Sequence, residues 1–239
     1  MTDDLRKSQL KSLKRRELLK LSPLLLMGAF AIPKLQTPLL QEGVKFTDWA
    51  SSKWFRGNHL ATTFPDSKLT PMEKFYVNTY DVDDPGIDLD AWKLSVSGNV
   101  QRPGDYTLAQ IQALPKQTQN TRHICIEGWD VIGRFGGARI SDFLKLAGAD
   151  LNSQFLYVEC ADDYYESLDM PTALHPQSLL CYEMYDQPLT RTHGAPLRLR
   201  LPTRIGYKSA KYLTSLMVTN VVPRVGYWED QGYPAYYGI

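Results

Sequence analysis

The chain has 239 residues, of which 43% are hydrophobic and 22% charged, as expected for one globular domain with or without a targeting tail. Its net charge of +1 hides an uneven distribution, because residues 1–33 hold seven lysines and arginines against three acidic residues. The remainder carries 20 basic and 23 acidic residues, a net charge of −3. Neutralising phosphates requires a basic face, so this balance argues against a nucleic-acid-binding protein.

The basic N-terminal segment, residues 1–33, predicts an export signal. Lys14-Arg-Arg-Glu-Leu-Leu-Lys20 precedes an uncharged run over residues 21–32, and the Arg15–Arg16 pair resembles a twin-arginine signal. The run is shorter than the roughly 20 residues of a membrane-spanning helix. We therefore expect a periplasmic protein. An interfacial helix is the alternative, and association with the membrane through an uncleaved signal or through a partner stays open.

The rest of the chain predicts one mixed domain that follows an irregular arm. Residues 34–74 have scattered proline, glycine and polar residues with little periodicity, which indicates an arm before a domain over residues 75–239. Alternating or apolar runs predict strands at Trp92–Gly98, Gln154–Glu159, Leu197–Leu201 and Ser215–Val221. Short strands with long connections, and no parallel strand–helix–strand rhythm, favour a mixed α+β fold.

Two short helices are predicted from the residues at their ends. Thr107 is a suitable N-cap for a helix over residues 107–114, and the proline that follows stops it. A second helix over Ile140–Leu146 has Ser141 as its expected N-cap. Gly148 is the expected stop of this second helix, because glycine readily adopts the left-handed conformation found there.

Cys125 is the strongest candidate for a metal ligand. The other cysteines, Cys160 and Cys181, are far away in sequence, and even if two of the three formed a disulfide one thiol would remain. A thiolate is a soft ligand for a transition metal, and the sequence has no histidine cluster at metal-ligand spacing. For a lone cysteine the favoured interpretation is a packed core residue, although the polar neighbours Arg122, His123 and Glu127 are a poor environment for one. The family resemblance described below reverses this preference.

Two downstream segments combine glycine with basic side chains. They are His193-Gly-Ala-Pro-Leu-Arg198 and Pro202-Thr-Arg-Ile-Gly-Tyr-Lys-Ser-Ala-Lys211. An arginine can bind a phosphate through two nitrogens, and glycine-rich backbone offers amides to an anion. The alternatives are solvated surfaces: Arg198 and Arg200 alternate with leucines, as on the exposed face of a strand, and Lys208 and Lys211 suit a solvent-facing turn.

The three segments, in this order, resemble the molybdopterin-binding domain of the sulfite oxidase family. The resemblance extends from about Phe75 to about Asn220 and is strongest to the bacterial periplasmic branch that includes a molybdenum methionine sulfoxide reductase. It implies a sulfite oxidase-type α+β fold, a molybdenum–molybdopterin cofactor, and Cys125 as the catalytic metal ligand. The positions that it implies for cofactor binding are Asn78, Tyr80, Asp81, Cys160, His193, Arg198, Ser209, Ala210 and Lys211.

The resemblance also implies a small-molecule substrate and a separate electron donor. Oxygen-atom transfer moves two electrons, and the sequence has no haem, flavin or iron–sulfur motif. In the resembling branch the donor is a membrane haem b protein or a soluble c-type cytochrome. No second sandwich domain, which forms the dimer in eukaryotic sulfite oxidases, follows in this sequence, so we expect a monomer.

Charge near Cys125 and Cys160 favours reduction of a neutral S-oxide or N-oxide over oxidation of sulfite. The acidic residues are Glu127, Asp130, Asp162 and Asp163, the aromatic residues are Trp129, Tyr164 and Tyr165, and the arginines that would offset the acids are Arg122, Arg134 and Arg139. Carboxylates repel a small dianion. Three alternatives stay open: sulfite oxidation in the same fold, a hydrolase that pairs Cys125 with His123 or His175, and a non-catalytic binding protein that retains the fold.

Overall fold

The computed structural model describes residue 46, residues 59–79 and residues 84–235. The chain divides into two compact units, residues 1–47 and 48–239, and all described residues except Phe46 belong to the second. The predicted export segment and most of the predicted arm lie outside the described residues, so both stay predictions. Within the described part of the chain, no helix is long and apolar enough to cross a membrane.

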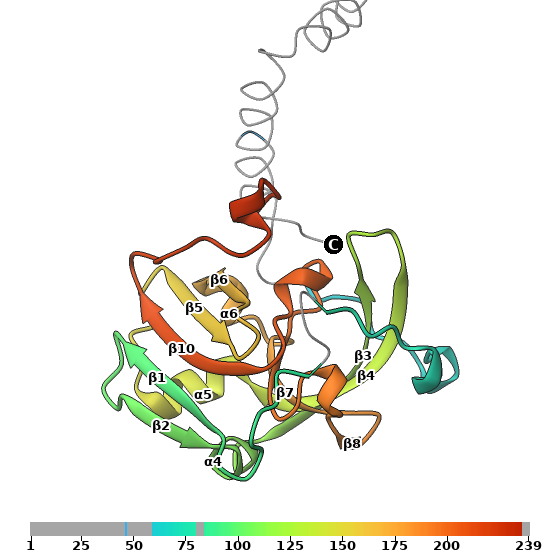
Figure 1. Cartoon of the computed structure of the whole chain (residues 1–239), viewed down its shortest axis with the longest axis horizontal. Coiled ribbons are helices and arrows are strands. Elements are labelled where there is room, and N and C mark those ends of the chain that lie inside the picture. The colour runs from blue at the N-terminus through green and yellow to red at the C-terminus, as the bar shows by residue number, and fades with distance from the viewer. Residues whose placement is uncertain (1–45, 47–58, 80–83, 236–239) are drawn as a thin grey trace, which may run out of the picture. The chain divides into compact units, whose positions relative to one another are not determined.

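The described residues form two five-stranded sheets, of which the first, called the β10 sheet below, has the strand order β2-β1-β10-β5-β6 (Figure 1). Its strands are β1 (Lys93–Gly98), β2 (Gly104–Thr107), β5 (Phe155–Cys160), β6 (Tyr165–Asp169) and β10 (Leu213–Thr219). β1 and β10 pair in parallel, whereas the other neighbours pair antiparallel. The sheet therefore brings the N-terminal strand of the domain against its C-terminal strand.

The second sheet positions Cys125. It has the order β3-β4-β7-β8, and β9 also pairs with β7. Its strands are β3 (Lys116–Ile124), β4 (Asp130–Arg139), β7 (Leu179–Met184), β8 (Gln187–Pro188) and β9 (Arg198–Arg200). β3 and β4 form a long antiparallel hairpin whose turn contains Cys125. Where β4 meets β7, the register shifts at Gly137, and a Cβ there would lie 2.2 Å from Leu180 O, so the pairing requires glycine.

The predicted helix ends at Thr107 and Gly148 agree with the structure, and the predicted N-cap Ser141 does not. The helices are α4 (Leu108–Gln112), α5 (Ile140–Ala147) and α6 (Met170–Ala173). Thr107 caps α4, as predicted, and forms a reciprocal capping box with Gln110. Gly148 ends α5 with a φ of +65°, also as predicted. Ser141 as the N-cap of α5 is wrong: β4 leads directly into the helix, so Arg139 occupies the cap position.

The core lies mainly between α5 and the β10 sheet. Ile140, Phe143, Leu144 and Ala147 are buried along one face of α5, at the helical spacing that an amphipathic helix requires. They belong to the same hydrophobic cluster as Leu94 and other residues of β1, β5 and β10. A smaller cluster around Phe75 and Phe135 packs on the second sheet. The predicted α+β class is confirmed by these two sheets and their covering helices.

Candidate functional site

The turn between β3 and β4 presents the thiol of Cys125. The Cys125 amide donates to Trp129 O at 2.9 Å and the Gly128 amide donates to Cys125 O at 3.1 Å, so backbone hydrogen bonds close the turn. Gly128 has a φ of +95°, a conformation that favours glycine. Cys125 is 9% exposed and lines a cavity, where its thiol is accessible to a bound group while its backbone stays fixed.

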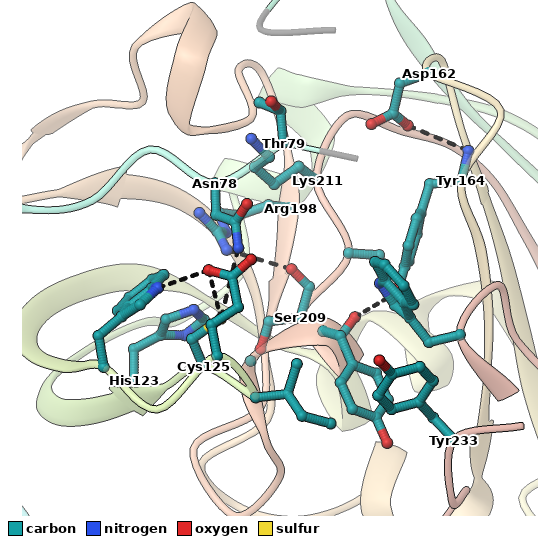
Figure 2. A pocket seen from close by; sticks show the side chains of 17 residues that line it. Asn78, Thr79, His123, Cys125, Asp162, Tyr164, Arg198, Ser209, Lys211 and Tyr233 are labelled. Atoms are coloured by element: carbon teal, nitrogen blue, oxygen red, sulfur yellow. Dashed lines mark hydrogen bonds between the residues drawn. The ribbon is translucent and has the colours of Figure 1, made fainter. Parts of the chain in front are cut away.

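This cavity, called the Cys125 cavity below, has a volume of about 280 Å³. Cys125 and His123 lie on one side of it and Asp162 and Tyr164 on the other (Figure 2). The predicted site residues that line it are Asn78, Cys125, Arg198, Ser209, Ala210 and Lys211. Asn78 and Lys211, which are more than a hundred residues apart in sequence, thus line the same cavity, as the family resemblance led us to expect.

The remaining predicted residues are placed differently. His193 lines a smaller cavity of about 30 Å³, which shares several lining residues with the Cys125 cavity. Cys160 is buried in the larger hydrophobic cluster and lines neither cavity. Tyr80 and Asp81 lie outside the described residues and stay predictions. All three cysteines are free thiols, so no disulfide joins Cys160 to Cys181.

Arg198 is a buried cation in the cavity wall. Its guanidinium donates to His193 O at 3.0 Å and to Ser209 O at 3.3 Å, and among the described residues no carboxylate pairs with it. Burial lowers the pKa of Arg198, because a charged group is poorly solvated there. The alternative of an exposed strand face is wrong: β9 pairs with β7, and the amide of the buried Leu199 donates to Ala210 O at 2.8 Å.

Burial, together with the neighbouring Arg200, holds His123 in its neutral form. The Arg200 guanidinium donates to Arg122 O at 2.6 Å and to Thr121 Oγ1 at 3.0 Å, and it stacks over the Phe135 ring at 4.4 Å. One of its nitrogens lies 3.2 Å from His123 Nδ1. Burial, and then the charges of Arg200 and Arg198, hold the pKa of His123 well below its usual value. A neutral imidazole therefore faces the Cys125 cavity.

The contacts of Cys125 argue against the cysteine hydrolase. Within the described residues its thiol lies 3.5 Å from Asn78 Nδ2 and 3.8 Å from Glu127 Oε2, and it makes no hydrogen bond to a histidine. Burial raises the pKa of Cys125, whereas a cysteine nucleophile needs a lowered pKa. His175, the other candidate base, contacts His59 O at 3.2 Å and does not line the cavity.

Aromatic and acidic residues line both sides of the Cys125 cavity. Beside Cys125, Trp129 donates to Glu127 Oε2 at 3.0 Å, and across the cavity the Tyr164 amide donates to Asp162 Oδ1 at 3.3 Å. Burial raises the pKa of Asp162. Of the three arginines expected to offset the acids, Arg122 pairs with Asp130, which is one of them, and the other two contact other groups: Arg134 pairs with Asp66 and Asp186, and Arg139 bonds to Gln117.

Three residues of the cavity wall were not predicted from the sequence. Thr79, Trp228 and Tyr233 line the cavity and were not among the predicted site residues. Trp228 and Tyr233 lie after the last predicted strand, in a stretch without helix or strand periodicity. The concentration of aromatic residues from Tyr227 onward is the one signal in the sequence that points to them.

A family profile described as "Oxidoreductase molybdopterin binding domain" matches residues 81–228, more than half of the chain. The chain belongs to this family. Membership confirms the predicted family and enzyme class, a molybdopterin-dependent oxidoreductase, and with it the binding of a molybdopterin cofactor. It leaves the roles of individual residues as predictions.

Two relatives and one solved structure illustrate the family. A protein of Azospira oryzae, whose name describes a candidate protein-methionine-sulfoxide reductase subunit YedZ1, is 45% identical over 191 residues, 79% of this chain and 72% of the relative. The catalytic subunit MsrP of protein-methionine-sulfoxide reductase from Xanthomonas campestris is 27% identical, over 72% of this chain and 59% of its own length. The chain thus spans less than two thirds of this second relative.

The solved structure is the sulfane dehydrogenase SoxCD from Paracoccus pantotrophus. Its TM-score is 0.53 at 20% identity, and the match covers 57% of this chain and 40% of that one. At this identity the likeness concerns the fold alone, and it agrees with the predicted sulfite oxidase-type fold.

The residues of the site fit a cofactor with an anionic end. Arg198 is a buried cation whose described partners are carbonyl oxygens, a placement that a phosphate compensates. His193 Nε2 is buried without a hydrogen-bond partner among the described residues, while Nδ1 lies 2.7 Å from Thr190 Oγ1. A buried polar atom of this kind requires a partner, and a polar pterin ring offers one.

Replacement of Gly206 tests how closely the site is packed. A Cβ at Gly206 would lie 2.8 Å from both His123 Nε2 and Ile124 O, next to the Cys125 turn. Because backbone at Ile124 cannot move freely, we expect Gly206→Ala to lower the molybdopterin retained after gel filtration about tenfold, the effect of a strain of about 1.4 kcal/mol. Gln112→Ala, at an exposed position of α4 that does not line the cavity, is the control. Equal retention in both variants contradicts the tight packing.

Proposed function

We propose that this chain is a molybdenum–molybdopterin enzyme that reduces a neutral S-oxide, or an N-oxide, with electrons from a separate partner. For a sulfoxide, the sulfur–oxygen bond breaks as two electrons and two protons are taken up, and the products are the sulfide and one water. One observation carries the proposal: a single cavity is lined by a buried thiol, a buried arginine, and a set of aromatic and acidic residues. The names of the relatives, which describe reductases of methionine sulfoxide, support this direction.

The cationic side of the cavity is the part we assign to the cofactor. When bound, molybdenum–molybdopterin supplies oxygen-atom transfer coupled to two-electron chemistry. We assign Cys125 as the thiolate ligand of the metal, because it is the only cysteine among the described residues that lines the cavity. Arg198, Ser209 and Lys211 are assigned to the phosphate end.

Other residues contribute to cofactor binding with different chemistry. Asn78 donates toward Cys125 Sγ and orients the thiol, and His193 Nε2 is available to the pterin ring. Ala210 is the small residue that leaves room in the phosphate turn. Tyr80 and Asp81 keep their predicted role. Cys160 is left out of the proposed binding set, because its side chain packs in the core.

The aromatic and acidic part of the lining is the part we assign to the substrate. Glu127 lines the cavity beside Cys125, and a negative charge repels a small dianion such as sulfite by about 1 kcal/mol per close pair even in water. A sulfoxide carries no net charge and is not repelled. Trp129, Tyr164 and Trp228 offer flat apolar surface to its organic substituents. Sulfite oxidation in the same fold remains the competing proposal.

The electron donor and the cellular location are further parts of the proposal. We propose a membrane haem b protein or a soluble c-type cytochrome as donor, since the sequence has no redox motif of its own. Residues 1–33 act as the twin-arginine signal, residues 34–74 as an arm, and residues 75–239 as a monomeric catalytic domain in the periplasm. The word "subunit" in the name of the Azospira relative supports a separate partner.

Replacement of the thiol tests the metal ligand. Cys125→Ser should abolish turnover while leaving the fold and most of the bound pterin, because a hydroxyl is a harder and weaker donor than a thiolate. Cys181→Ser is the matched control and should be nearly silent, since Cys181 is fully buried and does not line the cavity. Turnover is measured with a reduced dye. Wild-type activity of Cys125→Ser, or loss of activity in Cys160→Ser alone, contradicts the assignment.

Substrate choice tests the direction of the reaction. The purified protein, supplied with a reduced viologen dye, should reduce methionine sulfoxide, dimethyl sulfoxide or trimethylamine N-oxide faster than the oxidised protein consumes sulfite. The physical reason is the carboxylate in the cavity, together with the absence of Arg122, Arg134 and Arg139 from its described wall. Both rates are measured on the same preparation. Rapid sulfite oxidation without oxide reduction overturns the substrate and leaves the cofactor assignment in place.

A further inference from the structure

A buried ion cluster lies behind the aromatic side of the Cys125 cavity. Lys208 Nζ is 2.7 Å from Glu166 Oε1 and also forms an ion pair with Glu229 Oε1. All three side chains are at most 3% exposed. Lys208 belongs to the segment predicted to bind phosphate, but it does not line the cavity, and the prediction that it is solvated is also wrong. Lys208 instead has a structural role, because its two carboxylate partners connect it to other parts of the fold.

The cluster joins three separate segments. Glu166 comes from β6, Lys208 from the 3-10 turn η4 (Gly206–Lys208), and Glu229 from the 3-10 turn η5 (Glu229–Gln231). Gly226 lies against both carboxylates, since a Cβ there would be 2.1 Å from Glu229 Oε2 and 2.5 Å from Glu166 Oε1. The backbone of Gly226 therefore covers the two carboxylates on the side of the C-terminal segment, and no side chain lies between them.

Residues 225–233, called the C-terminal strap below, are attached along the edge of β6. The Ser167 amide donates to Val225 O at 3.1 Å, and the Tyr227 amide donates to Tyr165 O at 3.1 Å. Tyr165 Oη donates to Asp230 Oδ2 at 2.7 Å. These contacts attach the strap to β6 of the β10 sheet, where Glu166 and Gly226 form an isolated antiparallel bridge.

The strap supplies aromatic surface to the cavity. Trp228 precedes Glu229 in sequence, Tyr207 precedes Lys208, and both rings line the cavity together with Tyr233. The Trp228 and Tyr233 rings pack edge to face with centroids 5.3 Å apart. Lys208 and Glu229 thus each sit one position after an aromatic residue of the wall, so the cluster controls where these rings lie.

The cost of burying these charges indicates that the cluster fixes the positions of the segments it joins rather than adding to the stability of the folded domain. Burying charges costs several kcal/mol, and apolar residues of equal volume would often be as stable. Two carboxylates also share one ammonium: burial raises the pKa of Glu166 to about 8, with Lys208 opposing and Glu229 adding to this shift. Glu229 and Tyr233 both lie beyond residue 228, where the match to the family profile ends.

We propose that the C-terminal strap is the specificity wall of the substrate site and that Lys208, through Glu166 and Glu229, is the residue that positions it. The substrates it selects are sulfoxides with an aryl or long alkyl substituent, which contacts Trp228 and Tyr233, over dimethyl sulfoxide. This inference rests on the proposed sulfoxide reduction. Aromatic faces attract both apolar substituents and sulfur, so the strap favours such substrates by contact rather than by charge.

Removal of one carboxylate tests the positioning role. Glu229→Ala takes away the strap's link to Lys208 but leaves the Lys208–Glu166 pair electrically balanced, so the domain is expected to fold. Hydrogen exchange of the holoenzyme should become about tenfold faster at the Tyr227 and Ser167 amides, which bond the strap to β6. Glu73→Ala, at an exposed glutamate outside the strap and the cavity, is the control and should leave exchange unchanged.

The same two variants test the specificity. In Glu229→Ala the ratio of kcat/KM for methyl p-tolyl sulfoxide to that for dimethyl sulfoxide should fall about tenfold, the equivalent of one lost aromatic contact, and in Glu73→Ala it should not change. Unchanged exchange in Glu229→Ala overturns the positioning role. Faster exchange with an unchanged ratio overturns the specificity role. If the wild type reduces neither sulfoxide, the proposed function and the specificity role both fail, while the exchange experiment still decides the positioning role.

Discussion

The burial of Arg198 without a carboxylate partner among the described residues is the constraint around which the site is arranged. Its described hydrogen bonds go to the carbonyl oxygens of His193 and Ser209, which solvate a cation less completely than water does. β9 carries this arginine between β7 and residues 210–213, so the side chain cannot turn to solvent. An anion bound at the cavity offsets that cost, and because it binds the folded state it also stabilises the domain.

The segment from Gly206 to Lys211 divides its basic residues between two tasks. Lys211 lines the Cys125 cavity and donates to Thr192 O at 3.1 Å, on the side assigned to the cofactor. Lys208 points away from the cavity into the pair of buried glutamates. Three residues of separation on a tight turn are enough to place one lysine in each environment. The cofactor side and the substrate side are thereby linked through a single short stretch of backbone.

Local signals in the sequence were sufficient for some elements and insufficient for others. Thr107 and Gly148 form hydrogen bonds to residues close in sequence, so their capping roles could be predicted from the sequence. The β3–β4 hairpin, β6 and β7 were not predicted: β4 contains Gly133, Gly136 and Gly137, which weaken any strand pattern, and β7 pairs with β4, which is distant in sequence. The three motifs located most of the cavity, whereas its C-terminal wall depends on long-range contacts that no periodicity records.

X-ray absorption at the molybdenum K-edge tests the central claim, that Cys125 is the protein ligand of a molybdenum–molybdopterin held in this cavity. The measurement compares the purified holoprotein with its Cys125→Ser variant at equal molybdenum content. We expect the molybdenum of the variant to have one sulfur ligand fewer than that of the holoprotein, with a lighter atom in its place. Identical sulfur shells in the two proteins, or wild-type protein that binds no molybdenum, would contradict it.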